Sequence, residues 1–295
     1  MKWIDYRKPK DVTEALALLE KARGRGRLIA GGTDLVLQLK RGEYQADLLV
    51  DISGMEELKQ IQAEDGWIRI GAGVTHGEVA RSSLIQREAK ALAEGCGQVG
   101  SPQMRNIATL MGNVLTAQPA ADGAIPLMAL EAELRVVSMS GERWVALEEA
   151  YRGIGLSAID ATKEIATVVR FRKLGDHGSS RFFRMARRKA LALPILNGAV
   201  AIVFNPSMNR IEKASIAIGP VADRPFRSRD AEVCLRSKEI SPELISEAAR
   251  ISSEEARPRS SLLRGSDIYR KEMVRLYVVR TIQRIIDEAR IGRPS

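Results

Sequence analysis

The feature that most constrains this chain is a glycine pair, Gly31-Gly32, between an apolar run and a helical pattern. The run Leu28-Ile29-Ala30 is typical of a short buried strand, and Leu35 opens the apolar pattern of a helix. Glycine lets the backbone approach an anion closely, and the free N–H groups of a first helical turn favour negative charge. We therefore predict a strand–turn–helix unit over 28–35 that holds a phosphate. A tight turn that feeds an ordinary surface helix is the alternative.

Two polar residues, Thr33 and Asp34, stand between the glycine pair and the helical pattern. A carboxylate that faced a phosphate would repel it. We therefore expect the Asp34 carboxylate to cap the turn and to point away from the anion.

The composition sets the class of protein. A length of 295 residues exceeds what one core usually organises, so two domains are expected. Hydrophobic residues make up 45% and charged residues 28%, which is ordinary for a globular protein and argues against disorder. Aromatic residues are only 4%, which disfavours a stacking surface for single-stranded nucleic acid. The net charge of +9 fits an anionic cofactor, an acidic partner or nucleic acid equally well.

Cysteine and histidine are scarce. Cys96 and Cys234 are far apart and cannot ligate an iron–sulfur cluster unaided, so a reducing cytoplasm is the expected location. The two histidines, His76 and His177, are too few for a zinc site, and no metal is expected in this chain. We find no signal-peptide core and no apolar run long enough to span a bilayer.

Apolar periodicity predicts helices and strands along the chain and an α+β organisation in its second domain. The pattern predicts a helix at 11–19 and strands at 48–52, 67–70, 134–138 and 167–172. A polar, glycine-bearing linker at 173–180 follows, and we predict two domains, residues 1–176 and 177–295. In the second domain we predict strands at 195–204 and 213–219 and helices at 231–235, 242–251 and 269–289.

The stretch 71–76 begins like the dinucleotide fingerprint G-x-G-x-x-G, but His76 stands where the third glycine belongs. No regular βαβ unit surrounds it. We therefore predict that a surface helix begins here and that His76 is structural rather than catalytic.

A second informative stretch runs from Val99 to Asp122 and is rich in small and turn-forming residues. Such a composition predicts a long loop folded against a ligand. Thr109 and Asn113 supply neutral hydrogen-bonding groups, and Asp122 can accept hydrogen bonds from sugar or ribityl hydroxyls. The alternative is a structural loop in which Asp122 caps a helix that starts near Ala124.

These stretches belong to a series of motifs that covers nearly the whole chain. In order they are Ala30-Gly31-Gly32-Thr33-Asp34-Leu35, Arg105-Asn106, Thr109-Leu110-Met111-Gly112-Asn113, Pro119-Ala120-Ala121-Asp122, Arg187-Arg188-Lys189-Ala190-Leu191-Ala192, Ile218-Gly219-Pro220-Val221-Ala222-Asp223-Arg224-Pro225 and Tyr269-Arg270. The series resembles the FAD-binding (medium) subunit of the molybdenum hydroxylase family, which includes xanthine, carbon monoxide and nicotinate dehydrogenases.

The resemblance implies a fold and a set of FAD contacts. The fold is a two-subdomain FAD-binding domain of the vanillyl-alcohol-oxidase (PCMH) type, followed by a carboxy-terminal domain of three antiparallel strands and a helix bundle. The pyrophosphate of FAD would lie on two loops, formed by Leu28, Ile29, Ala30, Gly31, Gly32, Thr33, Asp34 and Leu35 and by Thr109, Leu110, Met111, Gly112 and Asn113. Asp122 would hold ribityl or ribose hydroxyls. Near the flavin would lie Gly100, Ile165 or Ala166, and a basic residue such as Arg184 or Lys189.

The implied function is electron transfer within a multi-subunit oxidoreductase. A molybdenum-cofactor large subunit would hydroxylate the substrate, and [2Fe–2S] clusters on a small subunit would pass electrons to FAD on this chain. The FAD would deliver them to NAD or another acceptor, so this chain needs no catalytic residue and has little turnover alone. The basic run 181–189, which could also bind nucleic acid, would offset phosphate or reduced-flavin charge.

Two alternatives stay open. One is a stand-alone FAD reductase on a related fold, which would need its own substrate acid and lid. The other is a scaffold subunit without flavin, because Met111 replaces a family glycine and Pro194 removes an N–H near the flavin.

Overall fold

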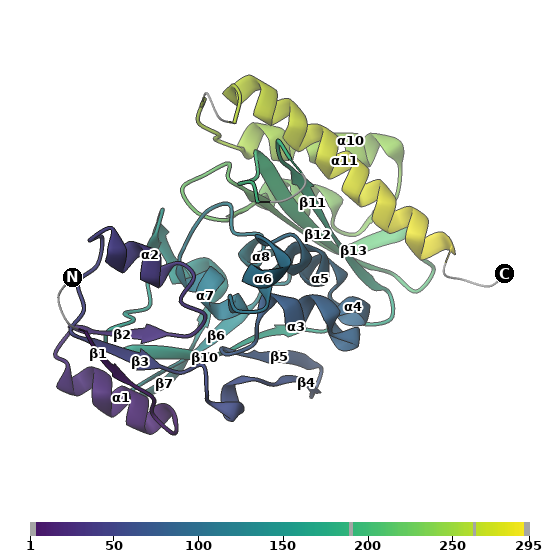
Figure 1. Cartoon of the computed structure of the whole chain (residues 1–295). Helices are drawn as coiled ribbons and strands as arrows, with labels where there is room; N and C mark the ends of the chain where they lie inside the picture. Colours follow the sequence, from purple (N-terminus) through teal and green to yellow (C-terminus); the bar gives the residue numbers. More distant parts are fainter. Residues whose placement is uncertain (1–3, 189–190, 262–263, 292–295) are drawn as a thin grey trace.

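The computed structural model describes residues 4–188, 191–261 and 264–291. The chain begins with a three-stranded parallel sheet in the order β1-β3-β2, beside helix α1 (Figure 1). Its elements are β1 (Asp5–Arg7), α1 (Val12–Lys21), β2 (Gly26–Ile29), α2 (Leu35–Lys40) and β3 (Leu48–Asp51). Helix α1 begins as predicted, because the Asp11 side chain accepts a hydrogen bond from the N–H of Glu14.

A five-stranded antiparallel sheet follows, in the order β4-β5-β10-β6-β7. Its strands are β4 (Ile61–Glu64), β5 (Trp67–Gly71), β6 (Glu133–Ser138), β7 (Gly141–Ala146) and β10 (Glu164–Arg172), with η1 (Glu56–Leu58), η2 (Leu147–Ala150), β8 (Tyr151–Gly153) and β9 (Leu156–Ser157) in the connections. Ile68 and Ile70 point into the first core, whereas the alternate residues of β5 face outward. The sheet therefore has one apolar face and one polar face.

Six short helices lie between β5 and β6. They are α3 (His76–Arg81), α4 (Ser83–Glu88), α5 (Lys90–Gly97), α6 (Pro102–Arg105), α7 (Leu110–Leu115) and α8 (Ala124–Ala129). Helix α8 is buried along its whole length, and α7 packs on β10. This helical layer lies between the five-stranded sheet and the strands β11 (Gly178–Met185), β12 (Leu196–Phe204) and β13 (Arg210–Gly219) that follow it in the chain (Figure 1).

The rest of the chain forms a second sheet with its own helices. Its elements are β11 (Gly178–Met185), β12 (Leu196–Phe204), β13 (Arg210–Gly219), β14 (Phe226–Arg227), α9 (Arg229–Leu235), β15 (Lys238–Glu239), α10 (Pro242–Glu255) and α11 (Asp267–Ile291). The three long strands are antiparallel, and the two-residue strands β14 and β15 both pair with β13. This matches the predicted three strands with helices.

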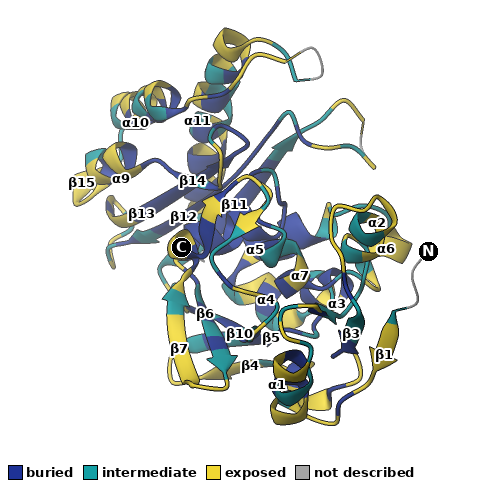
Figure 2. Ribbon diagram, turned by 90° about the vertical axis from the view of Figure 1, so that its left-hand side faces the viewer, coloured by how far each residue is buried: buried dark blue, intermediate teal, exposed yellow. Residues whose placement is uncertain are grey.

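Both faces of this second sheet are covered (Figure 2). On β12, Ala199 and Ala201 join the first core and pack toward α8, while Val200 and Ile202 join a second core beneath α10 and α11. Small residues on one face and branched ones on the other let the helical layer approach closely. The second sheet therefore contributes to both cores and joins the two parts of the molecule, which are the elements from β1 to β10 and those from β11 to α11.

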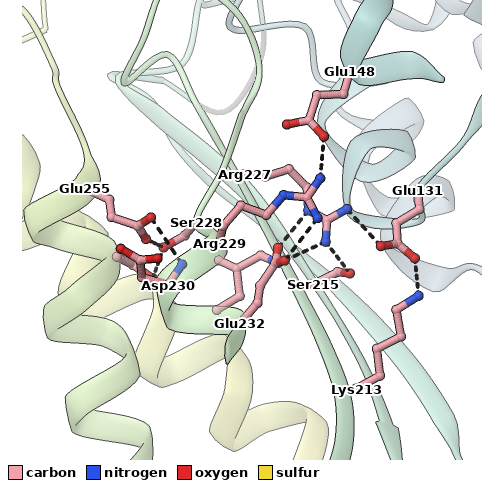
Figure 3. A network of polar contacts seen from close by, with 12 residues as sticks. Glu131, Glu148, Lys213, Ser215, Arg227, Ser228, Arg229, Asp230, Glu232 and Glu255 are labelled. Atoms are coloured by element: carbon pink, nitrogen blue, oxygen red, sulfur yellow. Dashed lines mark hydrogen bonds and ion pairs between the residues drawn. The ribbon is translucent and has the colours of Figure 1, made fainter. Parts of the chain in front are cut away.

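A buried polar network also joins the two parts (Figure 3). Arg227 donates to both carboxylate oxygens of Glu232 at 2.7 Å, to Ser215 at 2.9 Å and, across the junction, to Glu131 at 3.2 Å. Lys213 and Arg229 add contacts to Glu131 and Glu148. Burial alone would lower the pKa of Arg227, but the neighbouring carboxylates raise it overall.

Two expectations about local structure were wrong, and one strand was not predicted. The stretch 99–122 contains helices α6 and α7 instead of one long loop, the expected linker 173–180 already contains the start of β11, and edge strand β7 was missed. Over residues 4–188, 191–261 and 264–291, no helix combines the length and apolar character needed to cross a bilayer.

Candidate functional site

The two glycine-bearing segments lie directly against each other. A Cβ atom at Gly31 would stand 2.2 Å from the carbonyl oxygen of Ile107 and 2.9 Å from the Cα of Ala108. Real Cβ atoms never approach backbone so closely, so only glycine lets the two main chains meet here. The loop after β2 and the segment before Thr109, 76 residues apart at their contact, therefore share one surface.

The first segment forms the expected turn, with one correction. Gly32 has a φ of +67°, and its carbonyl accepts a hydrogen bond of 3.0 Å from the N–H of Val36 as α2 begins. Asp34 occupies the N-cap position but makes no capping bond, because its own backbone is already helical. Desolvation of the Asp34 carboxylate raises its pKa, and the Thr33 hydroxyl partly opposes this.

Helix caps explain why the second segment is helical. Ser101 accepts a hydrogen bond from the N–H of Met104, and Pro102 fills the first helical position of α6. Thr109 accepts a hydrogen bond of 3.1 Å from the N–H of Gly112 and so starts α7. Asn113 accepts one of 3.2 Å from the N–H of Gly123. The side chains of Thr109 and Asn113 thus hold the segment itself.

Met111 does not crowd the place where the segments meet. Its side chain is 3% exposed and lies in the first core with Leu110 and Val114. The Met111 side chain therefore neither fills the space between the segments nor points outward to solvent. The backbone N–H groups of Leu110, Gly112 and Asn113 donate to Val74 and Thr109. Within 110–113 this leaves the N–H of Met111, in the first turn of α7, to face an anion beside the first segment.

Asp122 is held by the second sheet. Its Oδ2 accepts a hydrogen bond of 3.0 Å from Nε of Arg184 on β11, and its Oδ1 accepts one of 2.7 Å from Nδ2 of Asn197 on β12. Burial raises the pKa of Asp122, although Arg184 and Asn197 oppose this. The alternative in which Asp122 caps α8 is wrong, because Gly123 occupies that position without a side-chain bond.

The sequence reasoning missed Asn197. Its contact with Asp122 spans 75 residues and cannot be read from spacing. A signal was nevertheless present, because Asn197 is the only amide within the buried run of β12. A polar residue buried in an apolar strand needs a hydrogen-bond partner.

The first half of the basic run 181–189 is internal, whereas Arg187 and Arg188 are exposed. Arg181 is buried and pairs with Glu288 and Glu94, and Arg184 pairs with Asp122. These two guanidinium groups therefore do not form a surface for nucleic acid. Lys189, the other basic residue expected near the flavin, lies outside the described residues.

The remaining expected residues lie just before α6 and on strand β10. Gly100 has a φ of +50° and precedes α6. Ile165 and Ala166 lie on β10 opposite Val137 and Val136, and their side chains are buried in the first core. They can offer backbone atoms but no side-chain contact.

His76 begins α3, as predicted, and lies next to the second segment. Its N–H donates to the carbonyl of Ala108 at 2.9 Å, and a Cβ at Gly123 would stand 2.9 Å from its Cε1. The ring is 0% exposed, and neither ring nitrogen has a hydrogen-bond partner among the residues that the structure describes. Burial first, and then the charge of Arg105, lower the pKa of His76 to about 4.

We expect His76 to make the stability of the protein depend on pH. The unfolded chain takes up a proton near pH 6.5 and the folded one only near pH 4, so stability falls as the pH drops through this window. The loss between pH 7 and pH 4 is about 3 kcal/mol. In urea unfolding, the free energy of unfolding of a His76→Leu variant should fall by about 3 kcal/mol less than that of the wild type between pH 7 and pH 4. Val74→Ala is the control, because it changes packing without removing a titrating group. It should lower the free energy of unfolding equally at pH 7 and at pH 4. An unchanged pH dependence in His76→Leu would contradict this reading.

Comparison with known proteins decides the family. Residues 2–171 match the model of the FAD binding domain in molybdopterin dehydrogenase, and residues 181–285 match that of the CO dehydrogenase flavoprotein C-terminal domain. The chain belongs to the family of FAD-binding subunits of molybdopterin dehydrogenases. It is therefore an oxidoreductase subunit whose cofactor is FAD, as the motif series implied.

Members of this family resemble the chain over its whole length. The nicotinate dehydrogenase FAD-subunit of Eubacterium barkeri is 30% identical over 299 residues, covering 99% of each chain. The xanthine dehydrogenase FAD-binding subunit of Escherichia coli O157:H7 is 27% identical, covering 97% of this chain and 96% of its own. The solved carbon monoxide dehydrogenase from Hydrogenophaga pseudoflava has a TM-score of 0.89 at 25% identity, covering 96% of each chain. The predicted fold is thereby confirmed.

The residues present fit an FAD. Gly31 lets the two main chains meet, so that backbone groups of both segments can face one phosphate. Next to the second segment the ring nitrogens of His76, and next to Asp122 the Oδ1 of Asn197, have no hydrogen-bond partner among the described residues. Buried polar groups are costly to leave unpaired.

Proposed function

We propose that FAD binds across the two glycine-bearing segments. Backbone N–H groups of 30–35 and 109–113 would hold the pyrophosphate, and Asp122 would accept from the ribityl or ribose hydroxyls. Gly100, Ile165 or Ala166, and Arg184 would lie near the flavin ring. The observation that carries this proposal is the contact of Gly31 with Ile107, which joins the two segments into one surface.

The subunit would serve as the outlet for electrons. FAD supplies both one-electron and two-electron transfer when bound, and the chain's own residues bind it and orient it. We propose that electrons arrive from [2Fe–2S] clusters on a small subunit, after hydroxylation on a molybdenum-cofactor large subunit, and leave to NAD or another acceptor. Support comes from the relatives' names, FAD-subunit and medium chain, which denote parts of larger complexes.

The proposal also includes a domain boundary and a cellular location. We place the domain boundary between residues 176 and 177, just before β11 begins at Gly178. We also propose a cytoplasmic location, in keeping with two free cysteines and no disulfide.

Reconstitution tests this function. The purified chain, stripped of cofactor and mixed with FAD, should bind it in a one-to-one ratio and show protein-bound flavin bands after gel filtration. The same chain carrying a tag and expressed in its own host should copurify with iron–sulfur and molybdenum polypeptides. Absence of flavin bands after reconstitution would favour the scaffold alternative and overturn the proposal. Bound flavin with substrate reduction by the isolated chain would instead favour the stand-alone reductase.

A further inference from the structure

Three residues at one register of the second sheet face a single turn of the first part. Arg184 on β11 lies opposite Asn197 on β12, and Asn197 lies opposite Gly219 on β13. Residues directly opposite on neighbouring strands point to the same side of a sheet. This row therefore presents a guanidinium group, an amide and a bare backbone side by side.

Each member of the row contacts the turn at 119–122. Asn197 donates to the carbonyl of Ala120 at 3.1 Å as well as to Asp122 at 2.7 Å, and Arg184 donates to Asp122 at 3.0 Å. A Cβ at Gly219 would stand 2.1 Å from the carbonyl oxygen of Pro119, so this position must be bare. The three residues of the row therefore form a surface on which the turn at 119–122 packs.

The row fixes the orientation of the Asp122 carboxylate and leaves its oxygens able to accept further hydrogen bonds. Each carboxylate oxygen of Asp122 accepts one hydrogen bond from the row, and each can accept a second. Asn197 is 0% exposed, so its amide has no competing water contacts and a single productive orientation. The two donors come from strands and not from loops, which keeps their positions rigid.

We propose that Asn197 is a positioning residue for the cofactor: it holds the Asp122 carboxylate in the orientation in which that group receives an FAD hydroxyl. This inference rests on the proposed role of Asp122 in FAD binding. It follows that the second sheet completes the FAD site, and that FAD binding and the docking of the 119–122 turn on the row strengthen each other.

Two variants separate a positioning role from a merely structural one. Asn197→Ala removes the donor without adding bulk, and should weaken FAD binding at least tenfold. The swap Asp122→Asn with Asn197→Asp restores an amide–carboxylate bond between the two positions but moves the negative charge to β12. The swap should recover the melting temperature of the cofactor-free protein while its FAD binding stays at least tenfold weaker than wild type.

The readouts are the FAD dissociation constant, from flavin fluorescence titration, and the melting temperature of the cofactor-free protein. Asn209→Ala, an exposed change in the hairpin of the same sheet, is the matched control and should alter neither. Wild-type FAD affinity in Asn197→Ala would overturn the inference. If Asn197→Ala does not fold, the swap decides, and full FAD affinity in the swap would equally overturn it. A wild-type chain that binds no FAD would instead refute the proposed function.

Discussion

Replacing Gly31 with alanine should weaken FAD binding at least 100-fold. The new methyl group would stand 2.2 Å from the carbonyl oxygen of Ile107, which is main chain and cannot rotate away. The two segments would have to separate, and a pyrophosphate could no longer contact both. Overpacking of this kind also costs about 1–3 kcal/mol of stability. The measurement is the FAD dissociation constant of the purified variant.

A matched glycine controls for the general effect of the substitution. Gly54 has open space around the position of a Cβ, and its φ is not in the left-handed region. Gly54→Ala should therefore bind FAD like the wild type. Equal FAD affinity in Gly31→Ala and Gly54→Ala would show that the contact between the segments has no part in binding.

Replacing Arg227 with methionine should lower the free energy of unfolding by about 3–5 kcal/mol. The guanidinium group is the counter-charge of Glu232, and both side chains are almost completely buried (Figure 3). Without it the buried Glu232 carboxylate keeps only the N–H of Ile216, at 2.9 Å, and the more distant Arg229, at 3.6 Å, as partners. The arginine also reaches Glu131, so the variant should loosen the junction between the two parts.

Urea unfolding of three variants tests this prediction. Arg229→Met removes a half-exposed arginine that pairs with the half-exposed Glu148 and lies 3.6 Å from Glu232, which keeps its closer partner Arg227. It should cost less than about 1 kcal/mol, the range of surface pairs. The double variant Arg227→Met with Glu232→Leu should recover most of the loss, because it removes both buried charges together. Equal losses in Arg227→Met and Arg229→Met would show that burial does not govern the energy of this network.

Local signals predicted many elements correctly because their causes are local. Asp11 caps α1, and the alternation around Ile68 and Ile70 gives β5, each from residues within a few positions. Strand β7 escaped because it is an exposed edge strand, and residues such as Glu142 and Arg143 lack an apolar face.

The helices of 99–122 were predictable from the chain and were missed. Ser101-Pro102 and Thr109 are ordinary helix-start signals, and the small residues around them obscured those signals. The contacts of the candidate site, unlike these helix starts, do not depend on neighbouring residues in the sequence. The approach of Gly31 to Ile107 and the bond from Asn197 to Asp122 join residues more than 70 positions apart, so only tertiary packing determines them.

Hydrogen exchange of the backbone amides, with and without FAD, tests the central claim most directly. FAD bound across both segments predicts slower exchange in 30–35 and in 109–113 together, with no change in the distant hairpin at 205–210. Protection in only one of the two segments, or in neither of them while FAD is bound, would contradict the account.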